Sequence, residues 1–187
     1  SISDDHRAIR EGVGAVVRKF DDDYWLARED DGEFPKEFHR AMADAGWLGI
    51  TMPAEYGGAG LGVTEAAIMM NEVASHGGAM AAASTVHINL FGPHPIVVCG
   101  SDDQKQRWIP RLIEGKDQVA FGVTEPNAGL NTTAIKTFAE KVPGGYKVNG
   151  TKIWTSNAHL CDFAISLFRT QVVPDKKHEG LSQFLVD

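Results

Sequence analysis

The spacing of apolar residues changes once along this chain, near residue 117, and that change separates two kinds of structure. Before it, apolar residues recur at helical intervals; after it, they alternate with polar residues in short runs. Helical intervals favour amphipathic helices, and alternation favours strands with one buried face. Because the predicted helices come first and the strands follow, we expect an α+β fold rather than a βαβ fold. We predict an N-terminal all-helical domain over residues 1–117 and a β-domain over residues 118–187.

The helices of the first domain are predicted from apolar faces and from the residues that begin and end them. Residues 5–20 place Ile9, Val13 and Val17 on one helical face. Residues 21–33 are acidic without such a pattern, and we expect a solvated loop there. Pro35 is predicted as the first residue of a helix that ends at Ala45. Thr64 is predicted as the N-cap of residues 65–75, and a further helix from Met80 is predicted to be broken by Pro93 and Pro95. A last helical pair is predicted to be capped by Ser101, interrupted at Pro110 and closed by Gly115.

Antiparallel strands are predicted for the second domain. The apolar pattern supports strands over residues 118–124, 134–142, 146–148, 162–169 and 181–186. Pro143-Gly144-Gly145 predicts one turn, and Asn149-Gly150 predicts a type I′ turn between Val148 and Thr151. The last strand would reach the end of the chain, where its edge lacks a partner. We therefore expect an incomplete antiparallel β-domain, and a chain that is a fragment of something longer.

Charge and hydropathy narrow the possible binding surfaces. The chain has 187 residues and a formal net charge of −7. This acidic balance argues against a general nucleic-acid surface or an anionic-membrane surface. No charged residue occurs between Val73 and Ser101, but histidines, glycines and prolines interrupt that stretch. Since a membrane span needs about 20 mainly apolar residues, we expect a helix surrounded by protein and no membrane span.

Cysteine, histidine and glycine patterns indicate neither a metal nor a phosphate loop. Cys99 and Cys161 have no metal-ligand spacing, and we expect two reduced, mostly buried thiols. The seven histidines form no metal-binding pattern, and those in the uncharged stretch are interpreted as core residues. The glycines of residues 57–62 lack the dinucleotide fingerprint, because Val63 stands where a glycine is required. A flexible entry to the next helix explains them.

The motif Phe121-Gly122-Val123-Thr124-Glu125-Pro126-Asn127-Ala128-Gly129 carries the strongest chemical signal. Pro126 stops a strand because it has no N–H for the ladder. Asn127, Ala128 and Gly129 then let the backbone turn away with its amides outward. Trp154-Thr155-Ser156-Asn157 follows further along and offers an aromatic face. Together these segments suggest a site for a flavin or a nucleotide.

Four segments, taken in order, resemble one known family. They are Pro53–Gly62, Gly100–Pro110, Phe121–Gly129 and Gly145–Ala158. This ordered set is similar to the acyl-CoA dehydrogenases, flavoproteins of fatty acid metabolism. The resemblance covers nearly the whole chain. It implies an N-terminal helical domain, a middle β-domain and a C-terminal four-helix domain that is absent here, with FAD as the cofactor and no metal.

The resemblance also implies roles for individual residues. Phe121, Val123 and Thr124 would meet the edge of the flavin ring, with their backbone groups and the Thr124 hydroxyl bonding its pyrimidine side. The Trp154-Thr155-Ser156 segment would pack against the flavin and offer Ser156 near N5. Leu130 stands where the family commonly has a serine that can contact the substrate, so this position is a predicted substrate contact that has lost its hydroxyl.

The implied reaction is the oxidation of an acyl-CoA to the 2,3-enoyl-CoA, with electrons passing to an electron-transfer flavoprotein. The family's glutamate base lies in the C-terminal domain, beyond Asp187, so no catalytic residue is assigned here. Glu125 is interpreted as holding loop amides rather than as a base. Two alternatives stay open: a flavin oxidase or monooxygenase on the same scaffold, and a non-catalytic flavin-binding subunit. A full-length homo-oligomer, dimer or tetramer, is expected, in the cytoplasm of a bacterium or the mitochondrial matrix of a eukaryote.

Overall fold

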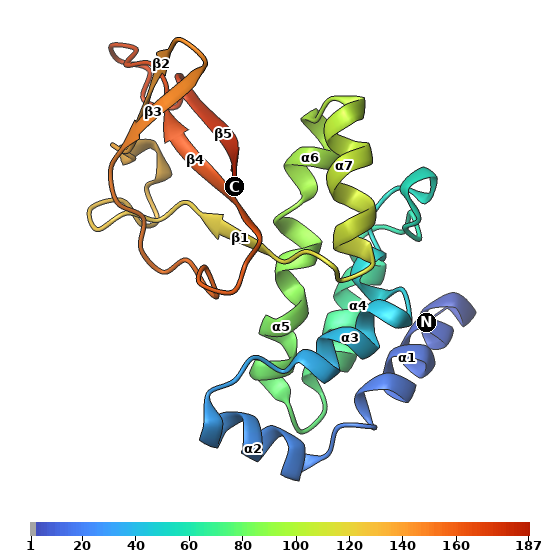
Figure 1. Cartoon of the computed structure of the whole chain (residues 1–187). Coiled ribbons are helices and arrows are strands. Elements are labelled where there is room, and N and C mark those ends of the chain that lie inside the picture. Colours follow the sequence, from blue (N-terminus) through green and yellow to red (C-terminus); the bar gives the residue numbers. More distant parts are fainter. Residues whose placement is uncertain (1–2) are drawn as a thin grey trace. The chain divides into compact units, whose positions relative to one another are not determined.

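The computed structural model describes residues 3–187 and divides them into two compact units. The first unit ends at Asp117, and the second runs from Gln118 to Asp187. The first contains the α-helices α1 to α7, and the second contains a five-stranded sheet (Figure 1). Helices followed by strands confirm the α+β prediction. Each unit is described by itself below.

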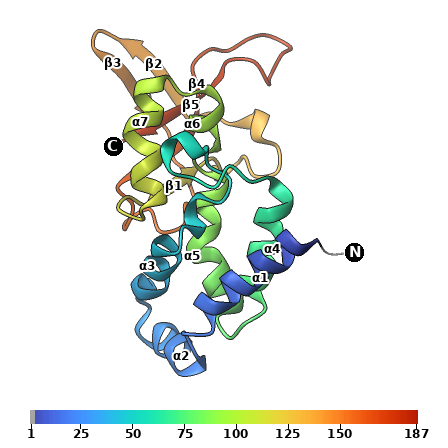
Figure 2. The same cartoon turned by 90° about the vertical axis from the view of Figure 1, so that its right-hand side faces the viewer.

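Over the described residues 3–117, the helical unit contains seven α-helices and two short 3₁₀ turns. Helix α1 packs against α4, and α4 packs against α5 (Figure 2). Helix α3 and the turn η1 also contact α5. The bounds are α1 Asp4–Val17, α2 Asp22–Asp31, α3 Lys36–Asp44, η1 Trp47–Gly49, η2 Ala54–Tyr56, α4 Val63–Ala74, α5 Ala79–Phe91, α6 His94–Cys99 and α7 Asp102–Ile113.

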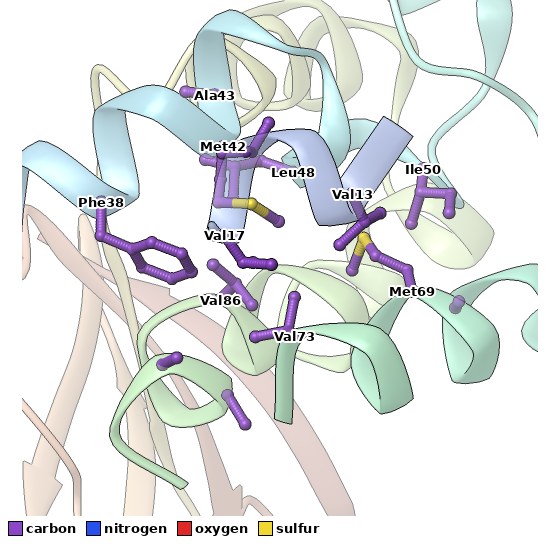
Figure 3. Packing of buried hydrophobic residues seen from close by; sticks show 14 of the residues in the cluster. Val13, Val17, Phe38, Met42, Ala43, Leu48, Ile50, Met69, Val73 and Val86 are labelled. Carbon is purple, nitrogen blue, oxygen red and sulfur yellow. The ribbon is translucent and has the colours of Figure 1, made fainter. Parts of the chain in front are cut away.

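One apolar core holds these helices together. Phe38 and Met42 from α3 and Val13 from α1 are completely buried (Figure 3). Val73 from α4 and Val86 from α5 close the cluster from the other side. Burying side chains of this size stabilises a fold by about 1.5–3 kcal/mol each. Ile9, Val13 and Val17, which helical spacing predicted on one face of α1, are all buried, so the predicted face is confirmed.

The acidic segment predicted to be a loop is instead helix α2. The Asp21 side chain accepts a hydrogen bond from the Tyr24 amide at 3.0 Å and caps the helix. Trp25 is buried in the core and anchors it. Gly32, with φ of 68°, ends the helix in the left-handed conformation. The loop prediction was wrong because acidic residues at a helix N-terminus favour the helix through its dipole.

Three predicted helix boundaries were also wrong. The N-cap of α4 is Gly62, whose amide donates to the Glu65 carboxylate at 2.9 Å, so Thr64 lies inside the helix. Pro95 lies in the first turn of α6 instead of breaking a helix, because a proline there loses no helical hydrogen bond. Helix α7 continues through Pro110 to Ile113. The buried residues Ile109 and Leu112 on both sides of this proline hold its helix against the core.

Ser101 caps α7 as predicted, whereas the glycine segment predicted to be a flexible entry is held by backbone hydrogen bonds. Ser101 and Gln104 form a reciprocal capping box at the start of α7. After η2, the chain folds back on residues 49–52: the amides of Ala59, Gly60 and Leu61 donate to the carbonyls of Gly49, Met52 and Ile50. These amides are therefore engaged within the unit and cannot cradle a phosphate.

The sheet of the second unit is mixed rather than wholly antiparallel. Its strand order is β1-β4-β2-β3, and β5 also pairs with β4. Strands β2–β3 and β4–β5 are antiparallel, whereas β1 and β2 both run parallel to β4. The bounds are β1 Val119–Gly122, β2 Phe138–Val142, β3 Gly145–Asn149, β4 Phe163–Arg169 and β5 Leu181–Val186, with the 3₁₀ turn η3 at Thr132–Ala134.

The predicted type I′ turn at Asn149-Gly150 was wrong. Strand β3 pairs back onto β2, with Val142 opposite Gly145, so the hairpin turns at Pro143-Gly144. Asn149 pairs with Phe138 at the far end of that ladder. Gly150, with φ of 151°, lies against Thr137 where a Cβ would not fit. The lack of a side chain at Gly150 therefore allows close packing against Thr137, and Gly150 does not form a hairpin turn.

The two thiols, and two histidines of the uncharged stretch between Val73 and Ser101, are more exposed than predicted. Cys99 is exposed and Cys161 is partly buried, and both are free thiols. His94 is exposed, and His76 is only partly buried beside Glu72, at 3.1 Å. Neither is a core histidine. Within residues 3–187, no helix has the length and apolarity to cross a membrane.

Candidate functional site

The predicted ligand motif, Phe121–Gly129, begins where two strands, β1 and β2, share one edge of strand β4. Strand β5 pairs with β4 along its whole length, from Ala164 to Arg169, and so occupies one edge of β4. The other edge is shared: β1 pairs with the first part of β4, and β2 reaches it only at Arg169. Residues 123–137 leave the sheet between these two partners and return to it. Val123 and Thr124 therefore follow β1 directly, where the partner along this edge of β4 changes.

The Glu125 carboxylate holds the backbone of residues 136 and 137, where this segment returns to the sheet. Oε2 accepts the amide of Lys136 at 2.7 Å, and Oε1 accepts the amide of Thr137 at 3.0 Å. Pro126 and Asn127 form a tight turn, in which the backbone groups of Glu125 and Ala128 bond each other twice. The interpretation that this carboxylate holds loop amides is confirmed.

Lys152 neutralises the buried carboxylate. Its Nζ donates to Glu125 Oε1 at 2.9 Å and to the carbonyl of Val123 at 2.9 Å. It also lies 5.6 Å from the ring centre of Phe168. Burial by itself would raise the pKa of Glu125, but the Lys136 and Thr137 amides and Lys152 outweigh burial and lower the pKa to about 2. Glu125 is therefore ionised at neutral pH.

A backbone hydrogen bond brings the two predicted ligand segments side by side. The amide of Ile153 donates to the carbonyl of Thr124 at 2.9 Å. The next residue, Trp154, has φ of 58° and is 85% exposed. A non-glycine residue with positive φ costs about 1–3 kcal/mol and persists only where its surroundings impose it. The indole is therefore exposed to solvent, one residue after the backbone contact with Thr124.

Both segments joined by this hydrogen bond carry backbone donors without a partner among the described residues. Within residues 3–187, the amides of Val123, Thr124, Trp154, Thr155 and Ser156 donate no hydrogen bond to another protein group. Unpaired donors beside an exposed aromatic ring fit a planar ligand that carries acceptors along its edge. An isoalloxazine ring has this chemistry.

The remaining predicted residues differ in their surroundings. Phe121 is partly buried in β1, and Ser156 is exposed in the turn that follows Trp154. Thr155 is partly buried, and its carbonyl accepts the Ala158 amide at 3.4 Å. Leu130 is fully exposed, so its side chain adds nothing to the packing of the unit.

Sequence reasoning missed Lys152 and Arg169. The Arg169 guanidinium donates to the carbonyls of Thr133 at 2.9 Å, Ile135 at 3.0 Å and Glu179 at 3.1 Å. It thereby ties the segment before β2 to the loop before β5. The sequence shows Lys152 only as a charge between Thr151 and Ile153, and Arg169 as a charge at the end of an apolar run, and neither pattern reveals the partners.

Two family models divide the chain between them. The model of the acyl-CoA dehydrogenase N-terminal domain matches residues 3–116, and the model of the middle domain matches residues 120–187. The chain belongs to the acyl-CoA dehydrogenase family. This membership confirms the resemblance that the four ordered motifs indicated.

Named members of the acyl-CoA dehydrogenase family are similar over most of the chain. An acyl-CoA dehydrogenase of Bacillus subtilis is 34% identical over 159 residues, which are 85% of this chain and 41% of that protein. The mitochondrial isovaleryl-CoA dehydrogenase of Pongo abelii is 31% identical over 188 residues, covering 100% of this chain and 44% of that protein. The chain thus spans less than half the length of these relatives.

Solved structures of similar fold include flavoproteins. The butyryl-CoA dehydrogenase of Megasphaera elsdenii matches with a TM-score of 0.87 and 26% identity, over 100% of this chain and 49% of that one. The FAD complex of PigA matches with a TM-score of 0.91 and 25% identity, again over 100% of this chain and 49% of that one. PigA has also been solved with FAD and proline.

Proposed function

We propose that this chain contributes the flavin-contacting part of an enzyme that oxidises an acyl-CoA thioester to the 2,3-enoyl-CoA. The observation that carries the proposal is the hydrogen bond from Ile153 to Thr124, which joins the segment of the exposed Trp154 to the segment of Val123 and Thr124. Family membership and the names of its relatives, which act on isovaleryl-CoA and butyryl-CoA, support the substrate class.

FAD is the proposed cofactor, and the residues around Trp154 fit it. The backbone groups of Phe121 and Val123 and the hydroxyl of Thr124 would bond the pyrimidine side of the flavin. Trp154 would cover one face, and Thr155 and Ser156 would lie near N5. When bound, the flavin supplies an acceptor for the hydride from the substrate β-carbon. The protein donors near N1, O2 and N5 would stabilise the negative charge that arrives with the hydride.

We assign no catalytic base within this chain. Glu125 is the carboxylate of the predicted motif, but its two oxygens already accept two amides and the ammonium of Lys152. Its low pKa makes it a poor proton acceptor at neutral pH. We propose that the base is the glutamate of the family's C-terminal domain.

The proposed partners follow from this reaction. An acyl-CoA is the substrate, and Leu130 is proposed to lie at the substrate end of the site. An electron-transfer flavoprotein is the proposed electron acceptor, and the full-length protein is proposed to be a homo-oligomer. The similarity to PigA, solved with FAD and proline, supports one alternative: a flavoenzyme on this scaffold that acts on a substrate other than an acyl-CoA.

Anaerobic reduction of the flavin tests the proposal. The full-length protein loaded with FAD is mixed with a series of acyl-CoA thioesters, and the visible flavin absorbance is followed. We expect at least one acyl-CoA to bleach the flavin, and the bleached form to react slowly with air. Rapid re-oxidation by air would favour the oxidase alternative. No bleaching by any acyl-CoA would contradict the proposed substrate class and favour a non-catalytic subunit.

A further inference from the structure

The side chain of Lys152 contacts the segment that precedes Glu125 as well as Glu125 itself. Its Nζ reaches the Val123 carbonyl and the Glu125 carboxylate, each at 2.9 Å. The side chains of Lys152 and Glu125 are only 12% and 8% exposed. In sequence, Lys152 lies two residues before Trp154. The ion pair therefore joins the two segments on which the predicted flavin contacts lie.

Stability alone gives little reason to bury this pair. Removing two charges from water costs several kcal/mol for each ion, and the mutual attraction of the pair often only balances that cost. A buried ion pair is thus weak evidence for stability, whereas its geometry can fix the conformation of the backbone that it contacts.

The contact with Val123 fixes the direction of an amide. A trans peptide is planar, so its C=O and N–H point in opposite directions. The peptide between Val123 and Thr124 turns its carbonyl toward Lys152. The amide of Thr124 must then point away from Lys152. Within residues 3–187 it donates to no other protein group.

We propose that Lys152, supported by Glu125, is a positioning residue that aims the Thr124 amide at the ligand and holds Trp154 beside it. The ammonium orients the Val123–Thr124 peptide, and the hydrogen bond from Ile153 to the next carbonyl sets the position of Trp154. This proposal rests on the proposed flavin site. Lys152 does not itself contact the reacting atoms, so its effect passes through the backbone.

Substitution of Lys152 tests the proposal with two readouts. Lys152→Met keeps the aliphatic stem and removes the ammonium, and Lys152→Arg restores a positive donor. Lys147→Met is the matched control, because Lys147 is exposed on β3 of the same sheet. For each full-length protein, FAD affinity is measured by the quenching of FAD fluorescence. Amide hydrogen exchange is measured at Ile153 and, as a reference for the whole sheet, at Ile165 in β4.

The proposal predicts that Lys152→Met weakens FAD binding about tenfold, equal to about 1.4 kcal/mol. Exchange at Ile153 becomes faster by a larger factor than exchange at Ile165, since breaking a buried ion pair also lowers the stability of the whole unit. Lys152→Arg recovers part of both losses, and Lys147→Met changes neither. Wild-type FAD affinity in Lys152→Met would overturn the proposal. So would equally faster exchange at Ile165, because Lys152 would then stabilise the whole sheet.

Failure of the proposed function would give a different result from failure of the positioning role of Lys152. If the wild-type protein binds no FAD at all, the flavin site is wrong, and the positioning role toward a flavin is wrong with it. The exchange measurement still decides whether Lys152 holds Ile153 against Thr124. Unchanged exchange at Ile153 in Lys152→Met would reject the structural link as well.

Discussion

Glu125 illustrates how a residue's surroundings decide its chemistry. A carboxylate in a cofactor motif could be a base or a structural acceptor, and the adjacent turn proline already favoured the structural role. The partners could not be predicted, because Lys136, Thr137 and Lys152 approach it only when residues 123–137 and β3 have folded. The same is true of Arg169, which donates to carbonyls of the segment before β2 and of the loop before β5.

The lowered pKa of Glu125 predicts how stability depends on pH. Its pKa falls from 4.5 to about 2 in the folded protein. A depressed carboxyl pKa adds stability above its unfolded value, and this contribution is lost as the pH falls from about 4.5 toward about 2. We expect Glu125→Gln to lower the free energy of unfolding at neutral pH by about 3 kcal/mol. Urea denaturation from about pH 7 to about pH 3 measures this difference.

The difference between wild type and Glu125→Gln should shrink as the pH falls. Glu140→Gln is the control, because Glu140 is exposed on the neighbouring strand β2, and we expect its unfolding free energy to stay within about 0.5 kcal/mol of wild type. A constant difference between wild type and Glu125→Gln across this pH range would show that the carboxylate charge has no part in stability.

At the scale of secondary structure, periodicity predicted most elements, and local chemistry decided the boundaries. Strand β5 was predicted with its exact bounds, and α1 was predicted with its buried face. Helix α2 was missed because its apolar face consists of little more than Trp25. The turn at Asn149-Gly150 was misplaced because Gly150 is needed for close contact with Thr137. The second error arises from a tertiary contact that a short sequence window does not contain, whereas the caps of α2 at Asp21 and Gly32 were local signals that went unused.

The cap of α2 can be tested directly. We expect Asp21→Ala to lower the free energy of unfolding by about 1 kcal/mol, because the Tyr24 amide loses its acceptor. Asp23→Ala removes a charge from the same first turn without removing the cap, and we expect a loss of about 0.5 kcal/mol or less. Chemical denaturation of the three proteins measures both effects. Equal losses in the two variants would mean that charge near the helix terminus, and not the capping bond, stabilises α2.

At the scale of the whole chain, the order of elements and the order of motifs carried different information. The change of apolar spacing predicted helices followed by strands, while the motifs indicated the family. Neither predicted the mixed sheet, because parallel pairing of β1 and β2 with β4 depends on which strands meet after folding. That pairing divides one edge of β4, and the motif that begins with Val123 and Thr124 leaves the sheet at this division.

The account depends most directly on the exposed face of Trp154. Because this side chain is 85% exposed, Trp154→Ala removes the proposed flavin contact with little effect on packing. Val172→Ala is the control, since Val172 is 71% exposed in another loop of the same unit. Titration of the full-length protein with FAD, followed by flavin fluorescence, should show binding by wild type and Val172→Ala, and affinity weakened about tenfold or more in Trp154→Ala. Equal FAD affinity in all three proteins would contradict the flavin site described above.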